Sequence, residues 1–324
     1  MELRWIGIDV SKGRLDAALF RDGRALERAF ANDEAGREAL LAWAGQGAGE
    51  ALPALCMEST GPYHLPLARL AHAAGLRVAV ENPRRALAYG HALGLVGKTD
   101  PADARLLARY GAAREPRPWA PPSEDLARLA ALDRRLVELD GLLGQEGNRL
   151  EDGTLDGLAR ESVGRVLAFL RAEREGVLRR LSEHVADHEG LAADVALPTS
   201  VPGIGPRAAV GFLAETAGRD FGSGEQLAAY AGVCPRRSQS GRKEGKARIS
   251  RQGNARLRSR FYLPAVVAKR HNPLVRELYE RLRARGMAKK AAVLACLRRL
   301  LMVCHAVLRD RRPFDPRHGK PQET

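Results

Sequence analysis

The stretch LRWIGIDVSKGRLDAALFRDGRALERAFA, residues 3–31, decides the fold of the N-terminal part of this 324-residue chain. Its apolar runs predict strands at 3–10 and 14–20. Asp22-Gly23 is a favourable two-residue turn and predicts a hairpin into a third strand at about 24–31. Three strands in immediate succession therefore open the chain.

Helices and strands alternate after these three strands. Asn32 is expected to cap a helix, and ALCME (54–58) is expected to form a buried strand. A helix at about 63–74 separates it from a further strand, RVAVE (77–81). Three consecutive strands followed by this alternation predict an α/β domain with a mixed sheet and helices on its faces.

Four acidic side chains form the candidate site of this domain. Asp9 and Glu58 stand at strand ends, and Asp100 and Asp103 share one helix face because they are three residues apart. If strand ends and helix meet in one cleft, the four carboxylates repel one another unless cations neutralise them. Oxygen ligands favour Mg²⁺, with Mn²⁺ as a substitute, and two such ions about 3.5–4 Å apart can activate a phosphodiester.

A structural role is the alternative for each acid taken alone: an N-cap, a turn residue or a solvated charge. Asp16 and Asp22 are assigned to that kind. The case for the set of four depends on apolar runs that direct Asp9 and Glu58 out of a sheet, together with the DxxD spacing.

The middle of the chain predicts paired helices. PRPWAPP (116–122) is a rigid, extended break, and beyond it leucines from Leu129 to Leu143 recur in alternating steps of three and four. A second seam runs from Val163 to Leu181, with Arg174 interrupting it. Such helices pair with each other or with a second protomer. The predicted division is a catalytic domain at 1–115, a linker with coiled-coil dimerisation helices at 116–195, a mainly α-helical C-terminal domain at 196–312 and a flexible tail at 313–324.

The segment Pro202-Gly203-Ile204-Gly205 precedes an apolar helix. It resembles the hairpin of helix-hairpin-helix DNA-binding modules, in which backbone N–H groups at a helix N-terminus take a phosphate. Gly203 and Gly205 are therefore candidate nucleic-acid contacts. An ordinary glycine-rich helix turn is the alternative.

Positive charge is concentrated in the second half of the chain. The net charge is +14, but residues 198–324 carry 27 Lys and Arg against 9 Asp and Glu. Lys and Arg are most densely clustered in and just after the stretch CPRRSQSGRKEGKARISRQGN (234–254). It predicts a loop that grips phosphate, or, as a sharper alternative, one that carries a serine attacking phosphorus. A merely arginine-rich surface is the remaining alternative. The candidate nucleic-acid-binding residues of this region are Arg236, Arg237, Arg242, Lys243, Lys246, Arg248, Arg251, Arg256 and Arg258.

Targeting and redox signals are weak. The four cysteines show no CxxC spacing, which argues against structural zinc and against a disulfide framework. The N-terminus lacks signal-peptide character, and no apolar run of about 18 residues is present. These features predict a reduced, cytoplasmic protein with no membrane partner.

Several blocks carry a resemblance to a known family. GIDVSKGRLDAAL, ESTGPYHLPLARLAHAAG and NPRRALAYGHALGLVGKTDPADARLLARYG resemble an RNase-H-like, RuvC-type domain with a DEDD acid set. LPTSVPGIGPRAAVGFLAE and QLAAYAGVCPRRSQSGRKEGKARISRQGNARLRSRFYLPA resemble the C-terminal domain of the same proteins. Over residues 4–318 the chain resembles the IS-one-ten (IS110) family of insertion-sequence transposases, DEDD recombinases guided by a bridge RNA.

The resemblance implies specific roles. Asp9, Glu58, Asp100 and Asp103 match the metal-binding acids of the family, and Ser240, within PRRSQSG, matches its nucleophilic serine. The implied activity is site-specific DNA recombination through a covalent phosphoserine link, without ATP. The implied partners are donor and target DNA, a structured guide RNA, and further copies of the chain in a homodimer or homotetramer, in which the serine of one protomer meets the acids of another.

Three other functions remain open on the sequence. A RuvC-like Holliday-junction or RNase-H-like nuclease would use the same acids with water as the nucleophile. A non-catalytic nucleic-acid-binding protein would use the acids structurally. An actin-like phosphotransferase would share the first hairpin, but the sequence lacks the glycine-rich ATP loops it requires.

Overall fold

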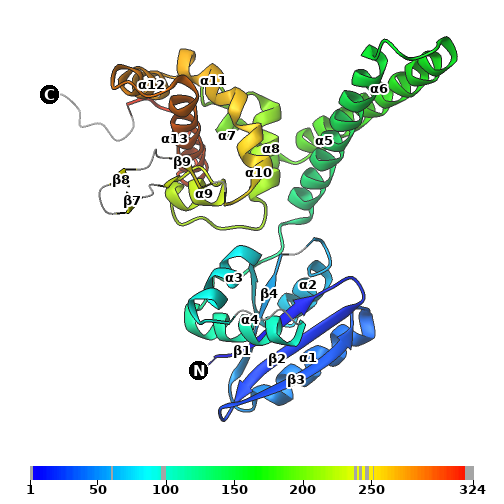
Figure 1. The fold of residues 1–324 in the computed structure, drawn as a ribbon, viewed down its shortest axis with the longest axis vertical. Helices are drawn as coiled ribbons and strands as arrows, with labels where there is room; N and C mark the ends of the chain where they lie inside the picture. The colour runs from blue at the N-terminus through cyan, green and yellow to red at the C-terminus, as the bar shows by residue number, and fades with distance from the viewer. Residues whose placement is uncertain are drawn as a thin grey trace. The chain divides into compact units, whose positions relative to one another are not determined.

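The computed structural model describes residues 3–59, 61–95, 100–236, 239–240, 243–244, 248–250 and 252–317. The chain divides into two compact units, Met1–Pro121 and Pro122–Thr324, and each is described by itself (Figure 1). The division falls within the proline-rich segment at 116–122. The domain bounds predicted above remain predictions.

The first unit is a five-stranded sheet with helices on both faces. The strand order is β3-β2-β1-β4-β5. β1 runs antiparallel to β2 and parallel to β4, while β4 and β5 are parallel to each other. This mixed sheet was predicted and is consistent with an RNase-H-like domain. Its elements are β1 Leu3–Val10, β2 Arg14–Arg21, β3 Arg24–Ala31, α1 Glu34–Ala48, β4 Leu52–Glu58, α2 Leu65–Ala73, β5 Arg77–Glu81, α3 Pro83–Ala92 and α4 Asp100–Arg114.

Local turn chemistry explains how this unit begins. Asp22 and Gly23 both adopt positive φ, 50° and 76°, which is the conformation a two-residue hairpin turn requires. The predicted cap at Asn32 is wrong: α1 is capped by Asp33, whose Oδ1 accepts the Gly36 N–H at 2.8 Å. Asn32 instead donates its amide to the backbone carbonyl of Ser11, 2.8 Å away, and so ties the strand end to the β1–β2 turn.

Each face of the sheet has its own apolar core. Ile6 and Ile8 point to one face and pack with Leu40 of α1 and Leu67 of α2. Trp5 and the other odd-numbered residues of β1 point to the opposite face, which α3 and α4 cover. The period-two alternation of the strand therefore determines which residues face α4.

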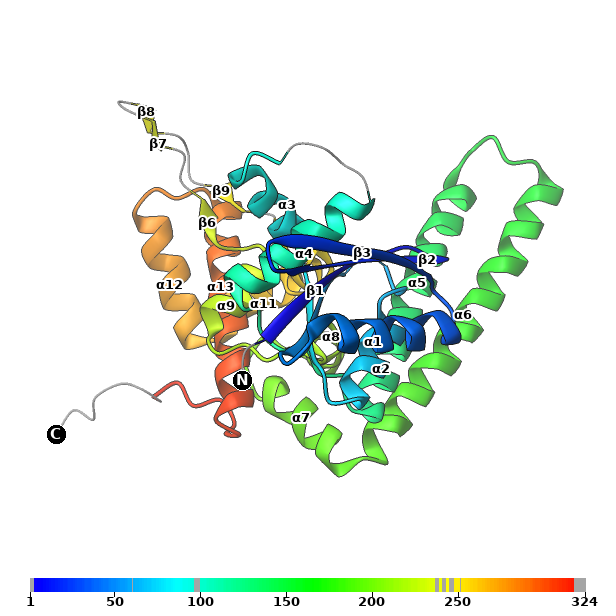
Figure 2. The ribbon, with the colours of Figure 1, turned by 90° about the horizontal axis from the view of Figure 1, so that it is seen from below.

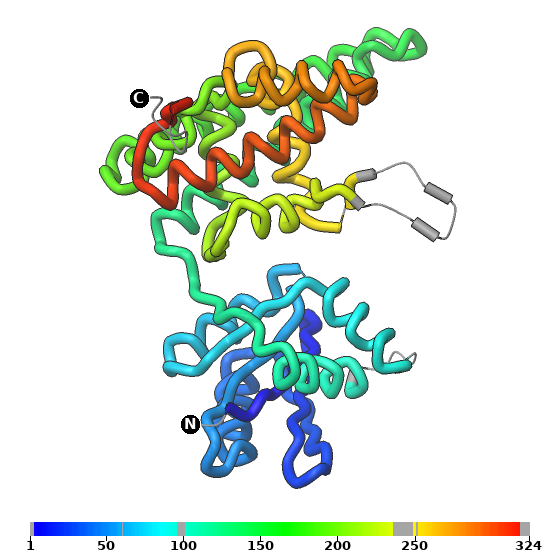
Figure 3. The backbone as a smooth tube through the Cα atoms, turned by 90° about the vertical axis from the view of Figure 1, so that its left-hand side faces the viewer, coloured from blue at the N-terminus to red at the C-terminus, as the bar shows by residue number. Residues whose placement is uncertain are grey.

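The second unit is helical. Its elements are α5 Glu124–Glu151, α6 Gly157–Ala186, α7 Glu189–Thr199, α8 Pro206–Thr216, α9 Gly224–Tyr230, β6 Pro235–Arg236, β7 Gln239–Ser240, β8 Lys243–Glu244, β9 Arg248–Ile249, α10 Ala255–Arg260, α11 Tyr262–His271, α12 Pro273–Ala284 and α13 Lys289–Arg309. Figure 3 follows the path of the chain through them.

Helices α5 and α6 form an antiparallel hairpin, visible in Figure 2. Leu129, Leu136 and Leu139 of α5 are buried, as are most seam residues of α6. The apolar stripe of α6 accommodates the charged Arg174 because its Nε donates a hydrogen bond to Asp140 Oδ1 of α5, at 2.6 Å. The apolar stripes of the two helices allowed pairing with each other or with a second protomer, and the structure shows them paired with each other.

Helix α13 lies at the centre of the C-terminal core. Leu297, Leu300 and Leu301 are fully buried in one cluster with residues of α8, α9 and α11. By length and composition α13 could span a membrane, the one such helix among the described residues, yet it packs as a core helix here. Pro264 lies in the first turn of α11, just after the break between α10 and α11 at Phe261, where its missing N–H costs no helical bond.

Candidate active site

Two candidate acids, Asp9 and Glu58, lie at one edge of the sheet on neighbouring strands. β1 and β4 are parallel, with Ile8 opposite Met57. Continuing this register by one residue places Asp9 opposite Glu58. Both side chains are half-buried. The strand-end pattern of the sequence thus brings these two carboxylates side by side.

Both acids belong to the sheet face that α4 covers. Gly7, two residues before Asp9, lies so close to α4 that an added Cβ would be 2.0 Å from the Ala104 carbonyl oxygen. Cys56, two residues before Glu58, belongs to the same cluster as Leu107 of α4. Because alternate residues of a strand share a face, Asp9 and Glu58 point toward the α4 side.

The N-terminal end of α4 lies over this edge of the sheet. Ala104 contacts Gly7, whereas Gly111 contacts Trp5, so α4 runs opposite to β1. Moving back one helical turn from Ala104 leads past Gly7 toward the level of Asp9. Asp103, half-buried, lies in this first turn, and Asp100 is the first residue of the helix. The Asp100 side chain lies outside the described part of the structure.

Two acids that the sequence reasoning missed extend the row. Asp16 of β2 pairs with Asp9, and Glu81 of β5 pairs with Glu58. Asp16 is 7% exposed and Glu81 9% exposed, so the assignment of Asp16 as a turn or solvated residue is wrong. Four neighbouring strands therefore carry a line of carboxylates across one face of the sheet.

Both missed acids left a signal in the sequence. Glu81 ends a predicted strand, as Glu58 does, so the rule that selected Glu58 selects Glu81 equally. Asp16 follows from hairpin register, since residues equidistant from the turn between β1 and β2 face each other.

Arginines flank the two outer acids. Arg14 forms a bidentate pair with Asp16, at 2.8 Å from Nε to Oδ2 and 2.7 Å from Nη2 to Oδ1. Arg85 Nη1 lies 3.4 Å from Glu81 Oε2. The two inner positions, Asp9 and Glu58, are those next to the end of α4.

A buried thiol reports the negative potential of this face. Burial, followed by the charges of Glu81 and Glu58, raises the pKa of Cys56 to about 12. The pKa of Tyr110 in α4 is raised as well, first by burial and then by Glu81. A concentrated negative potential with oxygen donors is an environment that attracts hard divalent cations.

The segment with the candidate nucleophile, 235–249, holds two short ladders. β6 pairs with β9, and β7 pairs with β8, with Ser240 opposite Lys243. Ser240 is the last residue of β7. Arg237, Arg242, Lys246 and Arg251 lie outside the described residues, and the side chains of Arg236, Ser240, Lys243 and Arg248 do so too.

A polar network holds the base of this segment. Asn254 Nδ2 donates to Glu215 Oε2 at 2.7 Å and to the Tyr230 hydroxyl at 3.0 Å. Arg256 Nε lies 3.1 Å from Glu215 Oε1. Arg258 Nη1 donates to the Ala231 carbonyl at 2.8 Å. Two candidate phosphate-binding arginines therefore also anchor the segment, and their nucleic-acid role stays a prediction.

The glycine-rich turn joins α7 to α8. Gly203 has a φ of 102°, and an added Cβ would lie 2.7 Å from Ala268 Cβ in α11. Gly205 precedes α8 in extended conformation and is exposed. The turn therefore requires glycine at 203 for conformation and for close packing, and its contact with phosphate stays a prediction.

Comparison with known proteins covers most of the chain. A family model for DEDD transposases of IS110 elements, described as transposase, matches residues 6–158. A model described as the transposase IS116/IS110/IS902 family matches residues 196–280. The pilin gene-inverting protein of Moraxella bovis is 30% identical over 98% of this chain and 99% of its own length. An uncharacterized 42 kDa protein of insertion element IS900 from Mycobacterium paratuberculosis is 40% identical over 36% of this chain and 30% of its own length.

The sheet with its acid row and the basic helical unit define a DNA-acting recombinase with a DEDD domain. Within that class, the chain belongs to the IS110/IS116/IS902 family of transposases. This confirms the resemblance seen in the sequence and the prediction of a transposase or site-specific recombinase. Membership implies DNA binding and suggests use of a divalent metal.

Proposed function

We propose that this transposase cleaves and rejoins DNA strands with Ser240 as the nucleophile and with Mg²⁺ held by Asp9, Glu58, Asp100 and Asp103. Mn²⁺ would substitute for Mg²⁺. The observation that carries the proposal is the row of carboxylates at one sheet edge, with the first turn of α4 over it. Carboxylate oxygens on three separate elements suit a hard cation that keeps some of its water.

The chemistry exchanges one phosphodiester for another. The Ser240 hydroxyl would attack phosphorus, lose its proton to a nearby base, and displace the strand's bridging oxygen. A phosphoserine and a free strand end result, and a new strand end reverses the step. A bound Mg²⁺ would polarise the phosphate and stabilise the charge that develops in the transition state. No net bond energy is lost, so ATP is not required.

The position of Ser240 supports this role. It ends β7, in a segment rich in Lys and Arg, and lies opposite Lys243 of β8. A hydroxyl is a weak nucleophile on its own and needs neighbouring positive charge at the phosphate. Arg236, Arg237 and Arg242 supply such charge in the sequence, and the hydrogen bond from Asn254 to Glu215 anchors the chain just after the segment.

The partners are proposed on separate grounds. The name of the Moraxella relative describes inversion of a gene, and inversion needs strands to be cut and rejoined in pairs. We infer that donor and target DNA bind the basic unit and that a noncoding bridge RNA supplies sequence specificity, because phosphate contacts carry none. The helix-hairpin-helix-like turn between α7 and α8 would contribute backbone contacts to phosphate.

We infer further that two or four copies assemble through the α5–α6 hairpin. Its outer surface exposes apolar side chains: Phe169 is 64% exposed, and Val166, Leu142 and Leu158 are exposed as well. Burial of these residues against a second hairpin, as a coiled coil, would remove them from water.

A denaturing protein gel tests the nucleophile. Labelled donor and target DNA are incubated with the full chain, Mg²⁺ and RNA transcribed from the flank of its own element. We expect labelled DNA at protein mass, lost in Ser240→Ala and in Asp9→Ala. Ser250 directly follows β9 in the same basic stretch, so Ser250→Ala is the matched control and should retain the adduct.

The second candidate function, a RuvC-like nuclease that uses water, predicts a different gel. Free cleaved DNA without an adduct, surviving Ser240→Ala but not Asp9→Ala, would replace the proposal with that nuclease. Omitting the RNA tests the guide separately, because a recombinase that needs no guide would form the adduct in its absence.

A further inference from the structure

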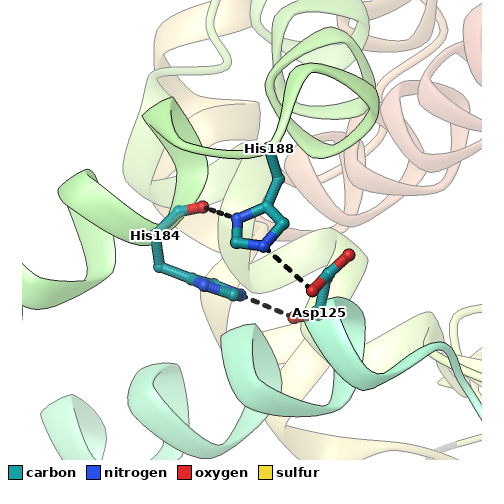
Figure 4. Close-up of side chains that lie close together, drawn as sticks. All are labelled: Asp125, His184 and His188. Atoms are coloured by element: carbon teal, nitrogen blue, oxygen red, sulfur yellow. Dashed lines mark hydrogen bonds and ion pairs between the residues drawn. The ribbon is translucent and has the colours of Figure 1, made fainter.

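Three polar side chains converge at the root of the α5–α6 hairpin, outside the transposase site (Figure 4). Asp125 lies in the first turn of α5, His184 in the last turn of α6, and His188 immediately before α7. Their ligand atoms, one from each residue, lie within 4.8 Å of one another. Three separate helices therefore meet through these side chains.

The hydrogen bonds fix which ring nitrogens carry protons. His188 Nδ1 lies 2.7 Å from the His184 carbonyl oxygen, and a carbonyl can only accept, so Nδ1 is the donor. His184 Nε2 likewise donates to the Asp125 carbonyl, 2.9 Å away. In neutral His188 the lone pair therefore resides on Nε2.

That lone pair faces a negative charge. His188 Nε2 is 3.1 Å from Asp125 Oδ1. Two acceptors at this distance repel each other unless a cation, either a proton or a metal ion, lies between them. His184 is 7% exposed and packs its ring 4.5 Å from that of His188, so a second nitrogen ligand is held beside the same point.

We propose that Asp125, His184 and His188 bind one divalent transition-metal ion of the Zn²⁺ class. His184 and His188 have the H-x₃-H spacing of zinc ligands. The Nδ1–H bond of His188 to a backbone carbonyl is the outer contact that orients metal-binding imidazoles. Imidazole nitrogens select Zn²⁺ over Mg²⁺, which prefers oxygen alone, so this site is chemically distinct from the acid row.

Small side-chain movements complete the site. In tetrahedral zinc sites, ligand atoms are about 3.3 Å apart, given bonds of about 2.0–2.1 Å. The Asp125 and His188 side chains are 49% and 36% exposed, so they can close toward the metal without repacking a core. His184 would change tautomer, with the Nε2 proton replaced by one on Nδ1, so that Nε2 gives up its bond to the Asp125 carbonyl and binds the metal. A water molecule would occupy the fourth position on the open side.

The ion would have a structural consequence for the hairpin. Asp125 is three residues beyond the boundary of the second unit at Pro122, and His188 precedes the helix that leads to the glycine-rich turn. Bound metal would therefore hold the start of α5, the end of α6 and the start of α7 in fixed positions relative to one another.

Cobalt spectroscopy on the full chain tests the site. Co²⁺ replaces Zn²⁺ and gives strong visible bands in tetrahedral sites, and the Asp9→Asn background removes binding at the acid row. We expect one Co²⁺ per chain, displaced by Zn²⁺ and not by Mg²⁺. His188→Gln should weaken binding by at least about 10–100-fold, the loss that follows even from removal of outer contacts. His91→Gln, an exposed histidine of α3, is the matched control.

A thermal readout keeps the test independent of activity. Zn²⁺ at about 100 times its dissociation constant should shift the unfolding equilibrium about 100-fold toward the folded state, in the parent and in His91→Gln but not in His188→Gln. Equal metal affinity in His188→Gln, or no metal bound by the parent, would overturn the proposal. The latter result would show that a proton, and not a metal, separates His188 from Asp125.

Discussion

Gly7→Ala should misplace the N-terminal end of α4 and slow the reaction. An added Cβ would lie 2.0 Å from the Ala104 carbonyl oxygen and 2.2 Å from the Ala108 nitrogen, whereas real Cβ contacts are essentially never under 3.0 Å. The atoms in contact are backbone and cannot rotate away. The helix must therefore retreat by about 1 Å, the difference between 3.0 and 2.0 Å.

The expected magnitudes follow from that displacement. Overpacking of this size costs about 1–3 kcal/mol of unfolding free energy. A misplacement of about 1 Å in catalytic geometry can cost about 100-fold in rate. Asp100 and Asp103 move with the helix, so Mg²⁺ affinity should fall together with the rate of adduct formation.

Two glycine variants separate geometry from stability. Gly13→Ala, in the nearby β1–β2 turn, meets nothing within 4 Å and should be neutral. Gly111→Ala crowds the Trp5 ring at 2.7 Å, at the other end of α4, and should lower stability with less effect on rate. Urea unfolding and adduct formation are measured on all three variants. A Gly7→Ala protein with parental rate and Mg²⁺ affinity would refute the placement of α4 against β1.

Three further outcomes are expected. The pKa of Cys56 rises from 9.0 to about 12 on folding, so between these pH values only the unfolded chain loses the thiol proton. The free energy of unfolding should therefore fall above pH 9.0 by up to about 1.4 kcal/mol per pH unit. Cys56→Ala should reduce that slope in urea titrations. Asp133→Asn should cost about 3–5 kcal/mol, since Asp133 is buried and pairs with Arg260 at 3.0 Å, whereas Asp140→Asn at an exposed pair should cost under about 1 kcal/mol. Phe169→Asp should weaken self-association in light scattering without loss of helicity, and an unchanged assembly would remove the hairpin surface as the interface.

Local patterns were sufficient to predict the sheet. Alternation of apolar residues set the strands, and the Asp22-Gly23 turn set the first long hairpin. The cap of α1 was misassigned by one residue because Asn32 and Asp33 are both good caps, and only the tertiary contact to Ser11 decides between them. Adjacent candidates of equal propensity are resolved by packing, which the local sequence does not contain.

The candidate site was only half visible in the sequence. Asp9 and Glu58 were found from strand ends, but Asp16 sits inside its strand, where a carboxylate is expected to be excluded. Its burial depends on the bidentate contact from Arg14, two residues away on the same face. The cluster of Asp125, His184 and His188 could not be predicted from the sequence, because about sixty residues separate Asp125 from His184 and only the pairing of α5 with α6 brings them together.

Repulsion between the two inner acids, Asp9 and Glu58, should lower the free energy of unfolding of the protein when no cation is bound. Neighbouring strands are about 4.8 Å apart, and two charges at that distance repel by about 3.5 kcal/mol at an effective dielectric constant of about 20. Arg14 and Arg85 pair with the outer acids, Asp16 and Glu81, and a divalent cation bound by Asp9 and Glu58 would relieve the repulsion between the inner two. Asp9→Asn should therefore raise the unfolding free energy without metal by about 1–3 kcal/mol and abolish the stabilisation that Mg²⁺ gives the parent. Asp22→Asn, in an exposed turn where asparagine also tolerates positive φ, is the matched control and should change neither quantity. Urea unfolding with and without Mg²⁺ decides the matter: a destabilised Asp9→Asn protein would mean that Asp9 supports the fold, and that the row of acids is not a strained cation site.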